Sequence, residues 1–394
     1  MNVVEIKREK STDRKDSLQF LPKSLEEISK VKTIKHKNIN LKTAYLVDII
    51  HGLLFKYYFK KENSFNLSSI ILKEKYGDKY NYYIDYLTVN GYIILVRKHL
   101  KGKNARIYKL NESIISGEIK RYRNSDKFLL KKFRLSQDIE YWESNEIPKD
   151  IKKKLIDDLS YVNIDYAKSI FFLDSTNQDI DIYNKNKYSV DCIKENHIFY
   201  HFDEYGRMHT NFTILKSFIR KNCLLIGGEE TSEIDIHNSQ PLFLCKLIKE
   251  NDLFIVDKSE FDLFRTLTMN GNFYRYIMDN SDIKDRKEIK EVVYKVLFGR
   301  NNKNKANEMF RKLFPTIFTF IKSYKKDLGD YRLLSYNLQR AESNLVFNKI
   351  VKKIMDLYPE IKIVTVHDSI ICAKKYKEVV DIIFKKILKE EFDF

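Results

Sequence analysis

The feature that most constrains this chain is an apolar stretch interrupted by an acid. Residues 361–375 read IKIVTVHDSIICAKK, two segments rich in apolar and β-branched residues on either side of His367, Asp368 and Ser369. This pattern predicts a β-hairpin whose turn carries a carboxylate. A charge between buried strands is costly unless it is paired or bound to a metal ion, although a turn is also an ordinary place for Asp. Asp368 is therefore a candidate metal ligand.

A second acid stands in a comparable position. Asp235 is the second-last residue of the run SEIDI, which predicts a short buried strand, and the following HNSQPLFLCKLI predicts the start of a helix. Asp is a common helix cap, but a carboxylate at a strand end is also well placed to hold a hard cation. Asp235 and Asp368 together are the minimum ligand set for two Mg²⁺ ions, for which Mn²⁺ can substitute, in a displacement of pyrophosphate.

Between the two acids, residues 285–301 (DRKEIKEVVYKVLFGRN) predict a helix with two different faces, which Gly299 ends. Residues at every fourth position share one face: Arg286, Lys290, Tyr294 and Phe298. The opposite face is apolar: Ile289, Val293 and Val296. Cations and rings in this order fit a nucleotide, with the cations on the triphosphate and the rings beside sugar and base. A solvated basic helix is the alternative interpretation.

These blocks resemble the A-family (DNA polymerase I-like) polymerases and their single-subunit phage-type RNA polymerase relatives, over roughly residues 205–375. The fingers helix of that family reads Arg-x3-Lys-x3-(Phe/Tyr/Met)-x3-Tyr-Gly, which this chain matches except that Phe298 replaces the last Tyr. Val366-His367-Asp368 matches the final hairpin of the family, and Asp235 precedes Ser-Gln as in its first catalytic strand, with two extra residues between. Gly206-Arg207, LQRAESNLVFNKI at 338–350 and FRKLFPTIFTFI at 310–321 resemble further blocks, in the family's order.

The resemblance implies a right-hand core of palm and fingers and a role for each matching residue. The catalytic residues would be Asp235, Asp368 and Lys290, with both acids binding metal and Lys290 able to protonate the departing pyrophosphate. The nucleotide would contact Arg286, Lys290, Tyr294, Phe298 and Gln240. The DNA duplex would contact Arg207, Gln339 and His367.

The choice of sugar is less clear from these residues. DNA polymerases of the family carry a Glu two residues after the Gln, where this chain has Leu242. Ser369 after His-Asp is more usual in the RNA polymerase branch, whereas Tyr294 belongs to the DNA branch, and Leu242 could exclude a ribose hydroxyl by its bulk. We expect a DNA polymerase of a plasmid, phage or other mobile element. The alternatives are a single-subunit RNA polymerase or primase, and a non-catalytic DNA-binding replication initiator.

The N-terminal half predicts a DNA-binding module. Helical patterns at 43–60, 67–77 and 79–91 are followed by strand-like segments at 92–96 and 105–110. This order resembles a winged-helix domain, which we place at 43–118; a small α+β bundle with a solvated hairpin is the alternative. In a winged helix, the basic residues of the hairpin would contact phosphates: Arg97, Lys98, Lys101 and Lys103.

Charge and composition fit this interpretation. The formal net charge of +17 favours a polyanionic partner, here a DNA primer–template with dNTPs, and replication proteins of the same element are further candidate partners. The four cysteines form no Cys-x-x-Cys pair and predict reduced core residues of a cytoplasmic protein without a membrane span. We expect an α+β fold with a basic flexible arm at 1–42, a helical, thumb-like linker at 119–204 and the polymerase core at 205–394, which leaves little room for a proofreading exonuclease.

Overall fold

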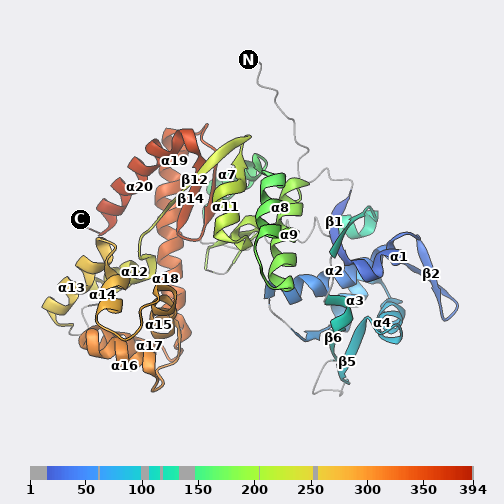
Figure 1. The fold of residues 1–394 in the computed structure, drawn as a ribbon, viewed down its shortest axis with the longest axis horizontal. Coiled ribbons are helices and arrows are strands. Elements are labelled where there is room, and N and C mark those ends of the chain that lie inside the picture. The colour runs from blue at the N-terminus through green and yellow to red at the C-terminus, as the bar shows by residue number, and fades with distance from the viewer. Residues whose placement is uncertain are drawn as a thin grey trace, which may run out of the picture. The chain divides into compact units, whose positions relative to one another are not determined.

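The computed structural model of the chain divides into two compact units, drawn in Figure 1. It describes residues 16–60, 63–98, 106–115, 119–132, 147–203, 205–251 and 256–392. The first unit comprises residues 1–143, 159–201 and 210–230, and the second comprises 144–158, 202–209 and 231–394. Helices and strands occur in both, so the fold is mixed α and β and agrees with the expected α+β class. Among the described helices, none is long and apolar enough to cross a membrane.

The first unit is built around the long helix α2. Its elements up to residue 124 are β1 (Ser17–Pro22), η2 (Lys23–Leu25), α1 (Glu26–Ser29), β2 (Thr33–His36), β3 (Ile39–Lys42), α2 (Thr43–Lys60), β4 (Phe65–Asn66), α3 (Ser69–Tyr76), α4 (Tyr80–Val89), β5 (Ile93–Arg97), β6 (Ile107–Leu110), α5 (Glu112–Ile115) and β7 (Ile119–Asn124). The helices and strands predicted between residues 43 and 110 are therefore confirmed in type and order. β4 was not predicted; it pairs with β6 and completes a sheet of order β4-β6-β5.

The flexible arm expected at 1–42 is wrong from Ser17 onward, and its first 15 residues lie outside the described part of the chain. β1 pairs antiparallel with β7, and β2 pairs with β3 through a turn whose Lys37 and Asn38 have left-handed backbones (φ +46° and +62°). Leu18, Phe20 and Leu41 are buried in the core of the unit. Lysines and acids stand between these apolar positions, so the sequence shows no regular alternation of apolar and polar residues. The strands form because segments far apart in the sequence pair with each other.

Helix α9 (Ile180–Lys194) completes the core of this unit from a distant part of the sequence. The Tyr188 ring packs against Phe20 and His51, at centroid distances of 4.2 and 5.9 Å. The remaining elements of the unit are β8 (Val162–Ile164), α8 (Tyr166–Ser175), β9 (Tyr200–Phe202), α10 (Asn211–Ile214), α11 (Ser217–Cys223) and β11 (Leu224–Ile226), with β8 and β11 paired. Helices α8 and α9, which lie within the helical linker expected at 119–204, thus belong to the first unit.

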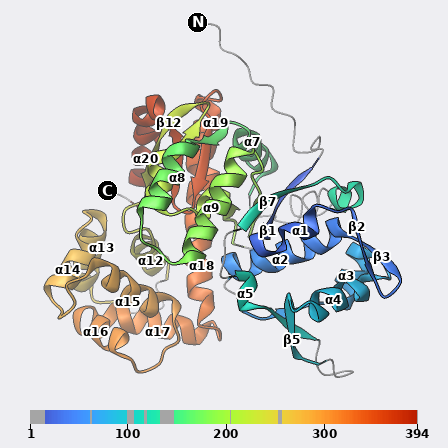
Figure 2. The same ribbon diagram turned by 45° about the vertical axis from the view of Figure 1, so that its right-hand side comes forward.

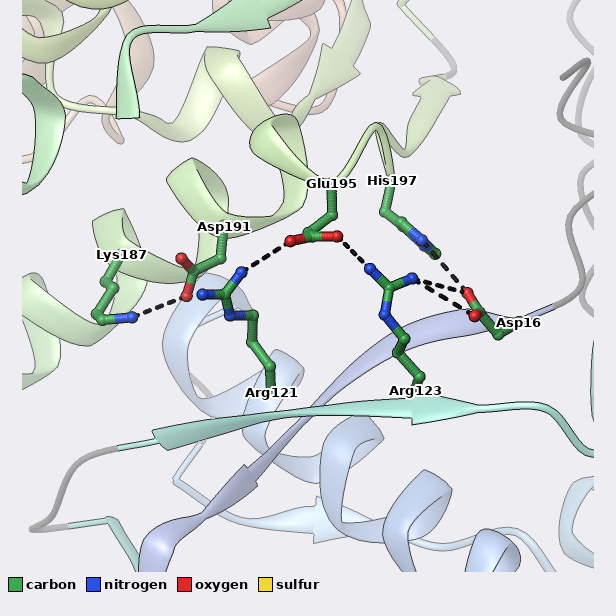
Figure 3. Close-up of polar contacts among 7 residues, drawn as sticks. All are labelled: Asp16, Arg121, Arg123, Lys187, Asp191, Glu195 and His197. Carbon is green, nitrogen blue, oxygen red and sulfur yellow. Dashed lines mark hydrogen bonds and ion pairs between the residues drawn. The ribbon is translucent and has the colours of Figure 1, made fainter. Parts of the chain in front are cut away.

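A polar network also ties α9 to the β1–β7 ribbon (Figure 3). Arg121 and Arg123 on β7 both donate to the carboxylate of Glu195, just beyond α9. Arg123 also pairs with Asp16 at 3.3 Å, and the ring of His197 lies 3.6 Å from the same carboxylate. The Leu18 amide donates to Nδ1 of His197 at 3.0 Å. Because several of these groups are half-buried, the network fixes the register of the ribbon more firmly than an isolated surface pair could.

The second unit contains three neighbouring strands, in the order β13-β14-β12, of an antiparallel five-stranded sheet. Its strands are β12 (Glu229–Asp235), whose first two residues belong to the first unit, β13 (Ile363–Val366) and β14 (Ser369–Ala373). β13 and β14 are buried along their whole length, as their apolar sequences predict. Helix α7 (Lys149–Leu159) is anchored to this sheet, because the buried Asp158 accepts the Ile363 amide at 3.0 Å.

Helices make up most of the second unit. They are α12 (Ser239–Lys249), α13 (Lys258–Met269), α14 (Phe273–Asp279), α15 (Arg286–Phe298), α16 (Lys305–Leu313), α17 (Pro315–Asp327), α18 (Arg332–Asn344), the π-helical η3 (Leu345–Val351), α19 (Lys352–Leu357), the short η4 (Lys374–Tyr376) and α20 (Lys377–Phe392). Figures 1 and 2 show α13–α17 gathered around one end of α18, which also packs against α12.

The division into units differs from the predicted boundary between residues 204 and 205. Residues 210–230 belong to the first unit, while 144–158 and 202–209 join the second. The short strand β10 (Met208–Thr210) lies at one of these crossings. The unit that each of these segments joins depends on its pairing with distant segments. This pairing leaves no local signal in the amino-acid composition.

Candidate active site

Strand pairing in the second unit brings Asp235 and Asp368 to the same end of the sheet. Asp235 is the last residue of β12, and it lies opposite Ser369 in the register of β12 and β14. Asp368 directly precedes Ser369, in the tight turn between β13 and β14. His367 in this turn has a left-handed backbone (φ +55°), which a short turn between paired strands requires. The hairpin and the strand predicted from sequence are both confirmed.

The electrostatics of this end of the sheet favour a cation. Burial, together with the carboxylates of Glu342 and Asp235, raises the pKa of Asp368 to about 7, while Arg207 opposes this rise. Asp235 is half-exposed, so its oxygens can be reached from solvent. Like charges held together in a partly desolvated place are relieved by a hard divalent ion with oxygen ligands. The two carboxylates therefore fit Mg²⁺ or Mn²⁺.

The protein alone supplies only part of a coordination shell. Within the described residues, no group of three or more His, Cys, Asp or Glu side chains is placed to hold a metal ion. Ions bound at Asp235 and Asp368 would need water or substrate oxygens as their other ligands, which is usual for Mg²⁺.

Glu342 on α18 organises the polar groups beside the acids, and the sequence did not predict it. Its carboxylate is only 2% exposed. It accepts hydrogen bonds from Ser239 Oγ and Gln240 Nε2, both at 2.6 Å, and it pairs with the Arg207 guanidinium. Two predicted site residues, Gln240 and Arg207, are thereby brought together. Glu342 engages the amide nitrogen of Gln240 and one terminal nitrogen of the Arg207 guanidinium, so both residues are placed to hold the site in shape.

Helix α15 presents the predicted face. Arg286, Lys290 and Tyr294 are exposed and Phe298 is half-buried, while the apolar side is buried: Ile289, Val292, Val293, Val296 and Leu297. The rings of Tyr294 and Phe298 stack, with centroids 5.4 Å apart and an angle of 17° between planes. Burial and then the Asp368 and Glu342 carboxylates raise the pKa of Tyr294. Tyr294 therefore lies within electrostatic range of Asp368 and Glu342.

Tyr274 on α14 contacts the two cations of this face and is a second residue that the sequence did not predict. Its ring lies under both cations, 5.5 Å from Lys290 Nζ and 5.9 Å from the Arg286 guanidinium. Burial raises its pKa, and the neighbouring Tyr294 adds to the rise. Cation–π contacts at these distances hold long side chains in one direction. Tyr274 therefore orders the two cations without carrying charge itself.

The C-terminal end of α15 is fixed by a buried lysine. Lys325 on α17 donates to the carbonyls of Val296 and Gly299, at 2.7 Å each. These carbonyls lack hydrogen-bond partners within the helix, and a cation there also interacts favourably with the negative end of the helix dipole. Burial lowers the pKa of Lys325 to about 8. Gly299 ends the helix as predicted, and a Cβ there would lie 2.4 Å from the Lys295 carbonyl.

A short turn before β10 positions Arg207. Asp203 accepts the amides of Tyr205 and Arg207, at 3.0 and 2.9 Å, and the ring of His209 at 2.8 Å. His209 in turn meets the His367 ring edge-on, with centroids 5.9 Å apart. The predicted DNA contacts Arg207 and His367 thus lie close to the acids. The third, Gln339, is half-buried on α18.

Two features used to weigh the choice of sugar play other roles in the structure. Leu242 is 4% exposed within α12, so its bulk is packed into the core. The Ser369 hydroxyl donates to Glu233 at 3.0 Å and to the Val366 carbonyl at 2.9 Å. Leu242 therefore contributes to the packing of α12 and Ser369 stabilises the hairpin, while exclusion of a ribose hydroxyl by Leu242 stays a prediction.

The predicted phosphate-binding residues of the first unit are only partly described. Arg97 ends β5 and Lys98 follows it, and both are exposed. Lys101 and Lys103 lie outside the described residues. α4 exposes Asn81, Tyr82 and Val89 to solvent. All four cysteines are free and buried, as predicted.

Comparison with protein-family models and with curated proteins finds no relative of this chain. No family model matches the chain, and no curated protein is significantly similar to it.

Proposed function

We propose that the second unit is the catalytic body of a template-directed DNA polymerase that adds dNTPs to a primer 3′-hydroxyl. In this proposal, the β12–β14 sheet with its two acids is the palm and α13–α17 are the fingers of a right-hand fold. The observation that carries the proposal is the register of β12 and β14, which sets Asp235 beside the turn that holds Asp368. These acids lie 133 positions apart in a helix-rich sequence, and Tyr294 on α15 lies within electrostatic range of Asp368.

The residues of the chain would divide the work as follows. Asp235 and Asp368 hold two divalent ions, which lower the pKa of the attacking hydroxyl and neutralise the triphosphate. Arg286 and Lys290 bind the phosphates from α15, and Lys290 is placed to give a proton to the leaving pyrophosphate. Tyr294 lies toward the acids and would contact the sugar.

Glu342 would keep this arrangement rigid. By accepting from Ser239 and Gln240 at the start of α12, it fixes the connection that follows Asp235. By pairing with Arg207, it also orients the predicted duplex contact. A catalytic site that is held before the substrate arrives loses less free energy to reorganisation during the reaction.

The first unit would bring the enzyme to DNA. Its order α2-β4-α3-α4-β5-β6, with the sheet β4-β6-β5, supports the expected winged-helix arrangement. Contacts from Arg97 and Lys98 would add affinity that falls with salt, without choosing sequence.

Primer extension with the purified chain tests the proposal. We expect extension with dNTPs and Mg²⁺ or Mn²⁺, and its loss in Asp235→Asn and in Asp368→Asn, because each acid supplies metal ligation at the transition state. Asp262→Asn, an exposed acid on α13, is the matched control and should extend normally. Extension with rNTPs alone would favour an RNA polymerase or primase. DNA binding without any extension would favour a non-catalytic initiator, and either acid variant keeping more than a few per cent of activity would contradict the metal assignment.

A further inference from the structure

A pair of stacked tyrosines lies outside the set of residues assigned above. The rings of Tyr205, in the turn before β10, and Tyr336, on α18, lie nearly parallel, with centroids 4.3 Å apart and an angle of 19°. The Arg340 guanidinium lies 5.9 Å from the centre of the Tyr205 ring. Both tyrosines are half-buried and Arg340 is exposed. Aromatic faces next to a guanidinium are the common recognition surface for unpaired bases and their phosphates.

The pair continues along one face of α18. Arg332, Tyr336 and Arg340 are spaced by four residues, so their side chains follow one another along the helix. From Arg332 to Arg340 the helix advances about 12 Å, which is room for roughly three stacked bases at 3.4 Å each. Arg332 is bound to Asp330 through two contacts, at 3.0 and 2.7 Å. Of these two arginines, Arg340 is the one whose guanidinium lies over the Tyr205 ring.

This surface adjoins the candidate active site. Tyr205 is two residues before Arg207, and Arg340 is two residues before Glu342, which pairs with Arg207. The rings therefore stand on the same turn and the same helix as residues that surround the acids. Bases of a duplex hide their faces against one another, whereas the bases of a single strand expose them.

We propose that Tyr205, Tyr336 and Arg340 form a stacking platform for the unpaired part of the template strand, an inference that rests on the proposed polymerase function. The tyrosine rings stack on the template bases whatever their sequence. Arg340 contacts the template strand between the stacked bases. The platform directs the template strand toward Asp235 and Asp368 and keeps the next template base from folding back.

Fluorescence of 2-aminopurine, which is quenched when the base stacks, tests the platform directly. The full chain is mixed with a primer–template in EDTA, without nucleotides, and the probe occupies successive unpaired template positions. We expect quenching at one to three consecutive positions near the duplex end. In Tyr336→Leu, this quenching should disappear, and the preference for an overhang over a blunt duplex should fall about fivefold or more.

Tyr331→Leu is the matched control. Tyr331 precedes α18 and carries Arg300 over its ring at 5.4 Å, but it points to another side of the helix. This variant should quench like the wild type. Arg340→Gln changes an exposed residue, so it carries the test if Tyr336→Leu does not fold, and it should weaken overhang binding several-fold. Equal quenching in wild type and Tyr336→Leu, or an equal loss in Tyr331→Leu, would overturn the platform.

Primer extension on the same substrates separates the two proposals. Quenching without extension would reject the polymerase and keep a site for single-stranded nucleic acid. Extension without quenching would reject the platform and leave the polymerase proposal standing.

Discussion

Among single residues, Glu342 combines deep burial with contacts to three residues of the candidate site: Ser239, Gln240 and Arg207. Removing one partner of a buried ion pair leaves the other charge without compensation. We therefore expect Glu342→Ala to lower the free energy of unfolding by about 3–5 kcal/mol, measured by urea denaturation. In the Arg207→Met background the same substitution should cost clearly less, since no cation is left unpaired. Equal costs in both backgrounds would show that the pair is not coupled.

The cations of α15 give a kinetic prediction at the same scale. Lys290→Ala should lower the maximal rate of extension by roughly 100-fold or more, as expected for loss of a general acid, whereas Arg286→Ala should mainly raise the apparent KM for the nucleotide. Lys295→Ala on the same helix is the control, because Lys295 is exposed on a different side. Steady-state kinetics on the three variants checks this. Parental rates in Lys290→Ala would contradict the role given to α15.

At the scale of elements, the C-terminal turn of α15 depends on hydrogen bonds from Lys325. Lys325→Met keeps the length of the side chain but leaves the Val296 and Gly299 carbonyls without their donor. Unsatisfied buried carbonyls cost roughly 1–3 kcal/mol, so we expect the last turn of α15 to fray. Faster hydrogen exchange of the 293–299 amides in Lys325→Met would show this. Unchanged exchange in that segment would mean that packing alone holds the turn.

Helix α2 gives a pH-dependent prediction. His51 accepts the Phe20 amide at 3.2 Å, and burial lowers its pKa from 6.5 to about 4, an effect that Lys75 increases and Asp48 opposes. Between these values the unfolded chain binds more protons than the folded one, so stability falls as pH drops from about 6.5 toward 4. His51→Gln can still accept the amide but does not titrate. Its thermal midpoint should change less between pH 7 and pH 5 than that of the wild type; an identical change would contradict the assignment.

On the scale of the whole molecule, the first unit is not a separable N-terminal module. Tyr188 and Cys192 on α9 belong to the same core as α2. Deleting residues 1–118 would expose that surface of α9, so we expect the 159–201 segment to become sensitive to protease. Limited proteolysis of the truncated chain, compared with the full one, checks this. Equal resistance would show that α9 is held without the N-terminal core.

The sequence predicted the local elements well and the long-range partners poorly. Residues 43–60 and 286–298 carry helical periods that tertiary packing leaves intact, and 363–373 is apolar enough to be a buried hairpin. Glu342 was missed because an acid on an amphipathic helix usually faces water, and only its position opposite α12 makes it buried. Tyr274 gave no signal, since its role depends on the packing of α14 against α15. The strand at Ser17 is stabilised by pairing with a strand a hundred residues away.

The bond between Asp158 and the Ile363 amide spans 205 positions. During synthesis from the N-terminus, α7 leaves the ribosome long before its partner strand exists. The first unit can close once residue 230 has emerged, whereas the sheet that carries both acids must wait for the last tenth of the chain. Contacts of such long range form slowly, and waiting segments are prone to association with other chains. A nascent chain stalled before β13 would therefore carry a finished first unit and an incomplete, aggregation-prone second unit.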